Sequence, residues 1–218
     1  MATKKEIDHA RNVCDLLKKE YPNAKSALDY TNPFELLIAT ILSAQSTDAL
    51  INIVTKTLFK KYKSPKDYIL APTEELEKDI FSTGFYKAKA RSLKNCSRIL
   101  QDEFSGKVPA NFDDLTKLPG VGRKTASVVA GNAFGIPAVA VDTHVIRLSN
   151  LLGFVDTKDA EKIEYKIKEL LPEEDWVKSS HLLATHGRRI CIARKPKCLE
   201  CVVGKICPSF NPLSSKKK

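Results

Sequence analysis

The segment at residues 118–142, LPGVGRKTASVVAGNAFGIPAVAVD, contains a glycine turn, a helix start and an isolated carboxylate. The turn is Pro-Gly-Val-Gly at residues 119–122, Lys124 falls in the first turn of the next helix, and Asp142 follows the apolar run Ala-Val-Ala-Val. Backbone N–H groups at a helix N-terminus point outward, and the helix dipole favours an anion there. The segment therefore predicts an anion-binding turn with an amine and a carboxylate placed by the same element.

Short helices are predicted on both sides of this turn, at residues 111–118 and 123–134, and together they form a helix–hairpin–helix motif. Glycines let a ligand approach the backbone without a side chain in the way. We expect Gly120, Gly122 and Arg123 to contact a DNA phosphate, which would position DNA without reading its sequence. An ordinary turn between two helices remains the alternative on these residues alone.

Lys124 is either a nucleophile or a phosphate contact. A lysine nucleophile must react as the neutral amine, and the positive end of a helix dipole together with partial burial favours that form. A helix start is therefore a suitable place for an amine nucleophile. A lysine that contacts phosphate as a point charge fits the same position.

Asp142 also has two interpretations. Aspartate is a preferred N-cap, and the sequence Thr-His-Val-Ile after it is a plausible first helical turn. A cap does not require the preceding Ala-Val-Ala-Val run, which we expect to bury the approach to Asp142 and hold it near the hairpin helix. A carboxylate in such a place can stabilise a developing cationic sugar or relay a proton. His144 is predicted to be a structural hydrogen-bonding residue.

The charge balance favours a polyanionic partner, because the 218 residues carry a formal net charge of +10. No stretch approaches the roughly 20 apolar residues that a membrane span needs, and residues 1–13 lack the apolar centre of a signal peptide. We therefore expect no membrane partner and a cytoplasmic, nucleoid-associated protein, or a nuclear one in a eukaryote.

The predicted fold class is all-α with two helical domains. Apolar residues recur at helical spacing over most of the chain, the run at residues 34–44 is apolar almost all round, and the only strand-like run is at 138–141. We predict a six-helix domain at residues 26–136 that carries the hairpin. Residues 1–25 and 137–211 are predicted to form the second domain, and residues 212–218 a disordered basic tail.

Four of the six cysteines crowd into the last 28 residues, which points to a metal. Cys191, Cys198, Cys201 and Cys207 have six, two and five residues between them. Four thiolates can bind zinc or an iron–sulfur cluster, but zinc ribbons pair two short Cys-x-x-Cys units and only one is present. Cys14 and Cys96 lie on apolar helix faces and are expected to be buried.

The sequences LPGVGRKTA and VAVDTHV resemble the helix–hairpin–helix DNA glycosylase superfamily, and more narrowly its endonuclease III family. The resemblance extends from FELLIATILSAQSTD to the C-terminal cysteines. It implies a bifunctional DNA glycosylase and AP (apurinic or apyrimidinic) lyase that removes oxidised pyrimidines from duplex DNA. The family's catalytic lysine falls on Lys124 and its aspartate on Asp142. Its 4Fe–4S cysteine motif matches at every position.

The resemblance also assigns residues that extract the damaged base. A glycosylase must flip its base out of the duplex, and another group must then fill the gap. Gln45 matches the residue that the family inserts into the stack, although it also fits a polar helix end. Phe85 falls where many relatives have a leucine wedge, and it suits either intercalation or the core. Lys87 and Lys89 beside it are predicted to contact phosphate or to form a solvated face.

The loop between Cys191 and Cys198 carries three basic residues, Arg194, Lys195 and Lys197. Both their position and the resemblance suggest phosphate contact, and a solvated basic loop is the alternative. The expected partner is duplex DNA with damaged pyrimidines or abasic sites, bound by a monomer. Two other functions remain open: a monofunctional mismatch glycosylase, which would lack a lysine at position 124, and a non-catalytic DNA-binding module.

Overall fold

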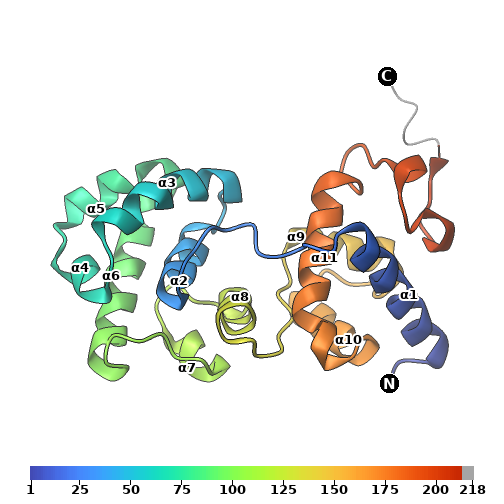
Figure 1. Cartoon of the computed structure of the whole chain (residues 1–218), viewed down its shortest axis with the longest axis horizontal. Coiled ribbons are helices and arrows are strands. Elements are labelled where there is room, and N and C mark those ends of the chain that lie inside the picture. The colour runs from blue at the N-terminus through green and yellow to red at the C-terminus, as the bar shows by residue number, and fades with distance from the viewer. Residues whose placement is uncertain (213–218) are drawn as a thin grey trace. The chain divides into compact units, whose positions relative to one another are not determined.

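The computed structural model describes residues 1–212, and residues 213–218 lie outside the described part. The basic tail predicted at residues 212–218 therefore lies outside it, apart from its first residue. The described chain consists of α-helices and short 3-10 turns and contains no strand, so the predicted all-α class is confirmed (Figure 1). It divides into two compact units: Ser26–Ile136, and Met1–Lys25 together with the chain from Pro137 onward.

The unit Ser26–Ile136 is a contiguous helical segment. Its elements are α2 (Pro33–Leu42), α3 (Asp48–Lys61), α4 (Pro65–Leu70), α5 (Thr73–Asp79), η1 (Phe81–Thr83), α6 (Tyr86–Glu103), α7 (Phe112–Lys117) and α8 (Arg123–Phe134). It has seven α-helices, one more than the six-helix domain predicted from the sequence. Helix α2 packs against α3, α6 and α8. As the apolar sequence predicts, residues 36–42 are all buried.

The second unit is built from both ends of the described chain. Its elements are α1 (Lys4–Glu20), α9 (Thr143–Leu151), α10 (Ala160–Leu170), η2 (Glu173–Asp175), α11 (Trp176–Arg189), η3 (Cys198–Glu200) and η4 (Gly204–Ile206). Helix α1 starts at a capping box formed by Thr3 and Glu6 and lies against α10 and α11 (Figure 1). Ala10, Val13 and Leu17 of α1 are fully buried there. The N-terminal helix and the last helices therefore share one hydrophobic core.

The apolar run at residues 138–141 belongs to no helix and pairs with no strand within residues 1–212. Val139 and Val141 are buried in the core that α1 shares with α9–α11, and the Ala140 N–H donates to Ser180 Oγ at 3.0 Å. The run is therefore an anchored connection that fixes the start of α9, where Asp142 stands.

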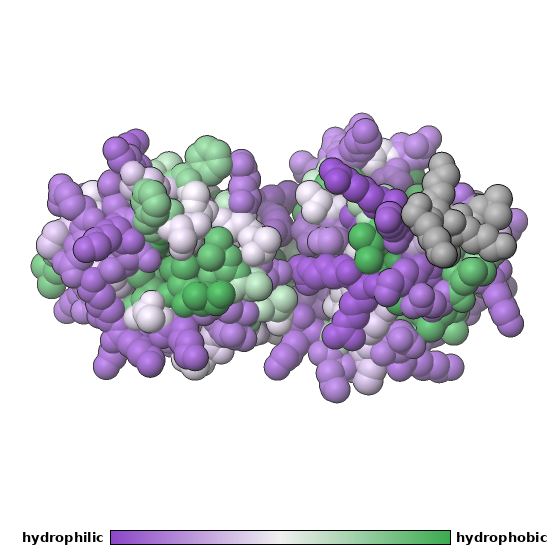
Figure 2. All heavy atoms as spheres, turned by 90° about the horizontal axis from the view of Figure 1, so that it is seen from above, coloured by the Kyte–Doolittle hydropathy of each residue, from purple (hydrophilic) through white to green (hydrophobic). Residues whose placement is uncertain are grey.

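The face of each unit that Figure 2 displays is mainly hydrophilic, with smaller apolar areas between the polar side chains. Cys14 and Cys96 are buried, as predicted, and burial raises the pKa of each thiol to about 12. No helix within residues 1–212 combines the length and the apolar character that crossing a bilayer requires.

Candidate active site

The predicted hairpin is present, with α7 and α8 on either side of a tight turn. The Val121 N–H donates to the Leu118 carbonyl at 3.0 Å, and Gly120 has φ of 82°. A Cβ on Gly120 would lie 3.0 Å from Ser92 Cβ and 3.3 Å from Ile41 Cγ2. Position 120 therefore requires glycine both for its left-handed backbone and for its close approach to α6 and α2.

Gly122 has a different part in the turn. It is the N-cap of α8, and a Cβ placed on it would meet no atom within 4 Å. Because Gly122 has no side chain, it offers no side-chain cap to α8, and an approaching anion would meet no side chain at this position. The hairpin thus combines one glycine that packs inward with one that leaves the backbone open.

Arg123 and Lys124 are the first two residues of α8. The Arg123 guanidinium carbon lies 5.4 Å from the centre of the Phe112 ring, a cation–π distance that ties the start of α8 to α7. The Lys124 side chain is exposed. The structure therefore places Lys124 in the first turn of a helix, next to the open backbone of Gly122.

Asp142 lies in the other unit, as the N-cap of α9. Its Oδ1 accepts the His144 N–H at 2.9 Å and the Val145 N–H at 2.8 Å, which confirms the predicted cap. Both cap hydrogen bonds use Oδ1, and neither uses Oδ2. His144 Nδ1 lies 3.4 Å from Arg147 Nη2, and Arg147 also donates to the Gly187 carbonyl at 3.0 Å.

The charge of Asp142 affects the pKa of His181 in α11. Burial is the main cause that lowers the pKa of His181 to about 4, the cations Lys178 and Arg188 lower it further, and the Asp142 carboxylate partly opposes them. In the folded state this imidazole therefore stays neutral at pH values somewhat below 6.5, its usual pKa.

This shift predicts an acid-sensitive fold. As pH falls from 6.5 towards 4, the unfolded chain takes up a proton at His181 that the folded chain does not, so stability is lost across that window. Between pH 7 and pH 5 the loss from this residue should be ~2 kcal/mol. Urea unfolding at the two pH values should show His181→Gln losing less stability than the parent protein by that amount. Equal losses in the two proteins would contradict the assignment.

Gln45 and Phe85 share an unusual backbone conformation. Gln45 follows α2 with φ of 55°, and Phe85 is the N-cap of α6 with φ of 50°. Both side chains are exposed, and the relative exposure of Phe85 is 67%. Phe85 is therefore a surface aromatic and not part of the core. Left-handed backbone costs free energy in non-glycine residues and concentrates where surrounding structure enforces it.

The prediction that Lys89 contacts phosphate or belongs to a solvated face is wrong. Its side chain is buried, with 6% exposure, and its amine is enclosed by backbone oxygens. The sequence did hold a signal for this burial. Lys89 stands four residues before Leu93 and seven before Cys96, which places all three on the buried stripe of α6.

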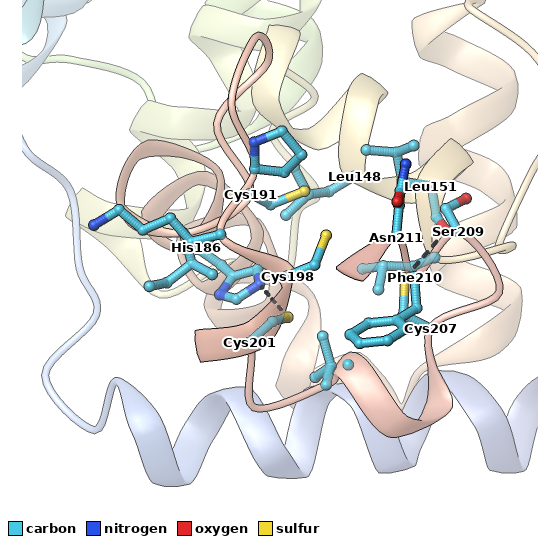
Figure 3. Close-up of a pocket in the computed structure, with 16 residues that line it drawn as sticks. Leu148, Leu151, His186, Cys191, Cys198, Cys201, Cys207, Ser209, Phe210 and Asn211 are labelled. Atoms are coloured by element: carbon cyan, nitrogen blue, oxygen red, sulfur yellow. Dashed lines mark hydrogen bonds between the residues drawn. The ribbon is translucent and has the colours of Figure 1, made fainter. Parts of the chain in front are cut away.

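The four C-terminal cysteines line one cavity of about 210 Å³ (Figure 3). Leu148, Val203 and Phe210 contribute apolar walls. Within residues 1–212, no three His, Cys, Asp or Glu side chains are grouped so that they could hold a metal ion. Burial raises the pKa of the Cys191 thiol to about 11 and also raises those of Cys201 and Cys207. The thiols therefore need a bound cation to ionise readily.

A histidine that the sequence did not single out lines the same cavity. His186 Nε2 lies 3.4 Å from Cys201 Sγ (Figure 3), and its Nδ1 lies 3.0 Å from Tyr21 Oη. Burial lowers the pKa of His186 to about 4. The neutral imidazole thus links helix α1 to the cysteine loop. The spacing between His186 and Cys191 matches no metal-binding motif, so the sequence offered no signal for the contact between His186 and Cys201.

The basic loop at residues 192–197 projects its cations outward. Arg194, Lys195 and Lys197 are all exposed, while the Lys197 N–H donates to the Ile190 carbonyl at 2.9 Å and closes the loop. Lys197 Nζ also lies 3.8 Å from Glu200, a distance of little energetic weight at the surface. The loop is therefore anchored by its backbone and leaves its basic side chains accessible.

Comparison with known proteins identifies the class that this fold and hairpin define. Residues 38–173 match the HhH-GPD superfamily of base excision DNA repair proteins. The endonuclease III of Bacillus subtilis (strain 168) is 48% identical over 194 residues, which cover 88% of this chain and 89% of that relative. The endonuclease III of Synechocystis sp. is 46% identical over 210 residues, covering 96% and 95%.

A solved structure of a trapped endonuclease III–DNA covalent intermediate, an estranged-adenine complex, is also similar. Its TM-score is 0.90 at 47% identity, and the match covers 96% of this chain and 98% of that chain. The chain belongs to the endonuclease III family, the bifunctional DNA glycosylases and AP lyases of base excision repair.

Proposed function

We propose that the protein excises oxidised pyrimidines from duplex DNA with Lys124 as its nucleophile. The observation that carries this proposal is the exposed Lys124 amine in the first turn of α8, beside the open backbone of Gly122.

The neutral amine attacks the sugar C1′, and the bond from C1′ to the base breaks with its electron pair moving to the base. The base leaves with a proton. The nitrogen lone pair then forms the C=N bond of the Schiff base as the bond from C1′ to the ring oxygen breaks, and this oxygen, which stays on C4′, takes a proton. Removal of a C2′ proton then expels the 3′ phosphate and nicks the strand.

Asp142 is the proposed carboxylate partner in this reaction. Its Oδ1 is committed to the α9 cap, which leaves Oδ2 to face positive charge that develops on the sugar or to relay a proton. The cap restrains the carboxylate, and the buried run before it restrains the backbone. A restrained carboxylate needs little reorganisation when charge develops in the transition state.

DNA docking and base extrusion are assigned to exposed groups on both units. We propose that the backbone at Gly120 and Gly122, together with Arg123, holds one phosphate, and that Gln45 and Phe85 enter the stack after the base has left it. Arg194, Lys195 and Lys197 provide further phosphate contacts. The partner is duplex DNA with damaged pyrimidines or abasic sites, and a similar endonuclease III has been solved in a covalent intermediate with DNA.

We propose a 4Fe–4S cluster as the cofactor, with Cys191, Cys198, Cys201 and Cys207 as its ligands. All four cysteines line one largely apolar cavity, and four thiolates are the usual ligand set of such a cluster. A cluster there would fix the basic loop, and with four thiolate ligands it would offer no open position for water. The substrate chemistry thus belongs to Lys124 and Asp142.

The domain assignment follows from the same proposal. Residues 26–136 act as the hairpin domain, residues 1–25 and 137–211 act as the cluster domain, and the protein works as a monomer in the cytoplasm, associated with the nucleoid, or in the nucleus of a eukaryote.

Borohydride trapping of the unmodified protein tests this function. Incubation with duplex DNA that contains thymine glycol or an abasic site, followed by reduction, should give a protein–DNA adduct, because borohydride reduces the Schiff base to a stable amine. Denaturing gel electrophoresis measures the adduct. Base release without an adduct would indicate a monofunctional glycosylase. DNA binding with neither base release nor a nick would leave only a binding module.

A further inference from the structure

Two of the three non-glycine residues with positive φ in residues 1–212 are Gln45 and Phe85, the side chains proposed to enter the DNA stack. Both stand in exposed turns, one after α2 and the other before α6. A strained turn keeps its conformation only where neighbouring groups enforce it. The structure must therefore contain contacts that hold these two turns in place.

The Lys89 amine supplies these contacts. Its Nζ donates to the Leu42 carbonyl at 2.8 Å, to the Thr83 carbonyl at 2.7 Å and to Ser46 Oγ at 3.2 Å. Leu42 and Ser46 flank Gln45, whereas Thr83 lies two residues before Phe85. All three donors of the ammonium are thus used, and they reach both turns from one buried point.

A direct contact between the two turns completes the arrangement. Ser46 Oγ donates to the Thr83 carbonyl at 2.5 Å. The Lys89 backbone N–H also donates to the Phe85 carbonyl at 3.0 Å, so the same residue anchors Phe85 through its main chain. Lys89, Ser46 and Thr83 therefore form a small cluster, which we call the Lys89 staple.

A buried lysine is an unfavourable choice for a purely structural link. Burial lowers its pKa, and its place in the first turn of α6 puts a cation at the positive end of that helix. The charge is favoured by its hydrogen-bond acceptors, above all the Leu42 carbonyl at the negative end of α2 and the Thr83 carbonyl. The staple joins two turns that the proposed function uses together.

We propose that Lys89 is a positioning residue that makes the Gln45 turn and the Phe85 turn one rigid unit, so that both side chains enter the DNA stack together. The proposal rests on the proposed function of Gln45 and Phe85. Lys89 itself touches no DNA, and it acts only by holding the two turns at a fixed separation.

The test compares Lys89→Met with a matched control on the same helix. Lys94 of α6 also donates to two backbone carbonyls, those of Ile69 at 3.2 Å and Ala71, but both lie at the C-terminal end of α4 and belong to neither turn. Each variant is measured on two substrates, a lesion in duplex DNA and an abasic site in a single strand. The second substrate needs no extrusion from a duplex.

Single-turnover trapping and the fluorescence of 2-aminopurine, placed opposite the lesion, are the readouts. Lys89→Met should slow trapping on the duplex by about 10-fold to 100-fold, abolish the rise in 2-aminopurine fluorescence, and leave single-strand trapping within about twofold of the parent. Lys94→Met should retain the parent's fluorescence rise and duplex trapping even if its melting temperature falls. If Lys89→Met keeps both duplex signals, the proposal is wrong.

Two further measurements keep the outcomes separate. If Lys89→Met does not fold, Ser46→Ala removes the Ser46–Thr83 bond and one acceptor of Lys89, and it should give the same duplex-specific loss; normal duplex signals would overturn the proposal. An unmodified protein that gives no adduct on either substrate would overturn the proposed function itself. Normal trapping and fluorescence in Gln45→Ala and Phe85→Ala would show that these side chains are not the ones inserted.

Discussion

Replacing Lys124 with glutamine should abolish the borohydride-trapped adduct and lower base release by about 10³-fold or more, because an amide nitrogen has no available lone pair for attack on C1′. The folded state should be unaffected, since Lys124 is exposed and glutamine is a good helix former. Gel-resolved trapping measures the adduct, and thermal unfolding followed by circular dichroism verifies the fold.

Lys117→Gln is the matched control for this variant. Lys117 stands at the end of α7 in the same hairpin, and its ion pair with Asp114 at 2.7 Å is exposed, so its loss should barely affect stability. Trapping by Lys117→Gln should match that of the unmodified protein. An adduct of normal yield in Lys124→Gln would assign the nucleophile to another amine.

Asp142→Asn should reduce the single-turnover rate of base release by about 10²-fold to 10⁴-fold while leaving the fold intact. Asparagine caps helices about as well as aspartate, so α9 should keep its N-terminus and only the carboxylate charge is lost. Rapid-quench measurement of base release with protein in excess over DNA determines the rate. Binding of the damaged duplex should change far less than the rate.

Asp159→Asn is the matched control, because it makes the same substitution at another aspartate that caps a helix. Asp159 caps α10 through Oδ1, which accepts the Glu161 N–H at 2.9 Å and the Lys162 N–H at 3.2 Å. This variant should keep both stability and activity. If Asp142→Asn and Asp159→Asn release the base at the same rate as the parent, Asp142 is only a helix cap.

The sequence was sufficient to predict features that depend on neighbours along the chain. The glycine turn, the cap at Asp142 and the all-α class follow from local preferences for turns, caps and helical periodicity. The burial of Cys14 and Cys96 follows from the same periodicity. The assignments of Lys124 and Asp142 to catalysis needed the family resemblance, because each residue alone has an ordinary structural explanation.

Features that depend on contacts across the fold were missed. The left-handed backbone at Gln45 and Phe85 has no local signature, because neither residue prefers that conformation and tertiary contacts enforce it. Lys89 was predicted to lie at the surface because lysine is charged, although its position on the helix matches the buried stripe. The contact between His186 and Cys201 joins residues whose spacing matches no metal-binding motif, so only the folded chain reveals it.

The shared core of α1 and helices α9–α11 has a consequence for the order of folding during synthesis. The segment 26–136 is contiguous, so it can fold as soon as it has left the ribosome. Helix α1 precedes this segment in the chain, yet the partners of Ala10, Val13 and Leu17 include α11, which is made after it. We therefore expect the apolar stripe of α1 to lack its native packing partners until α11 has been made. The cysteine loop follows α11 in the chain, so its four cysteines come together only after the helices of that core have been made.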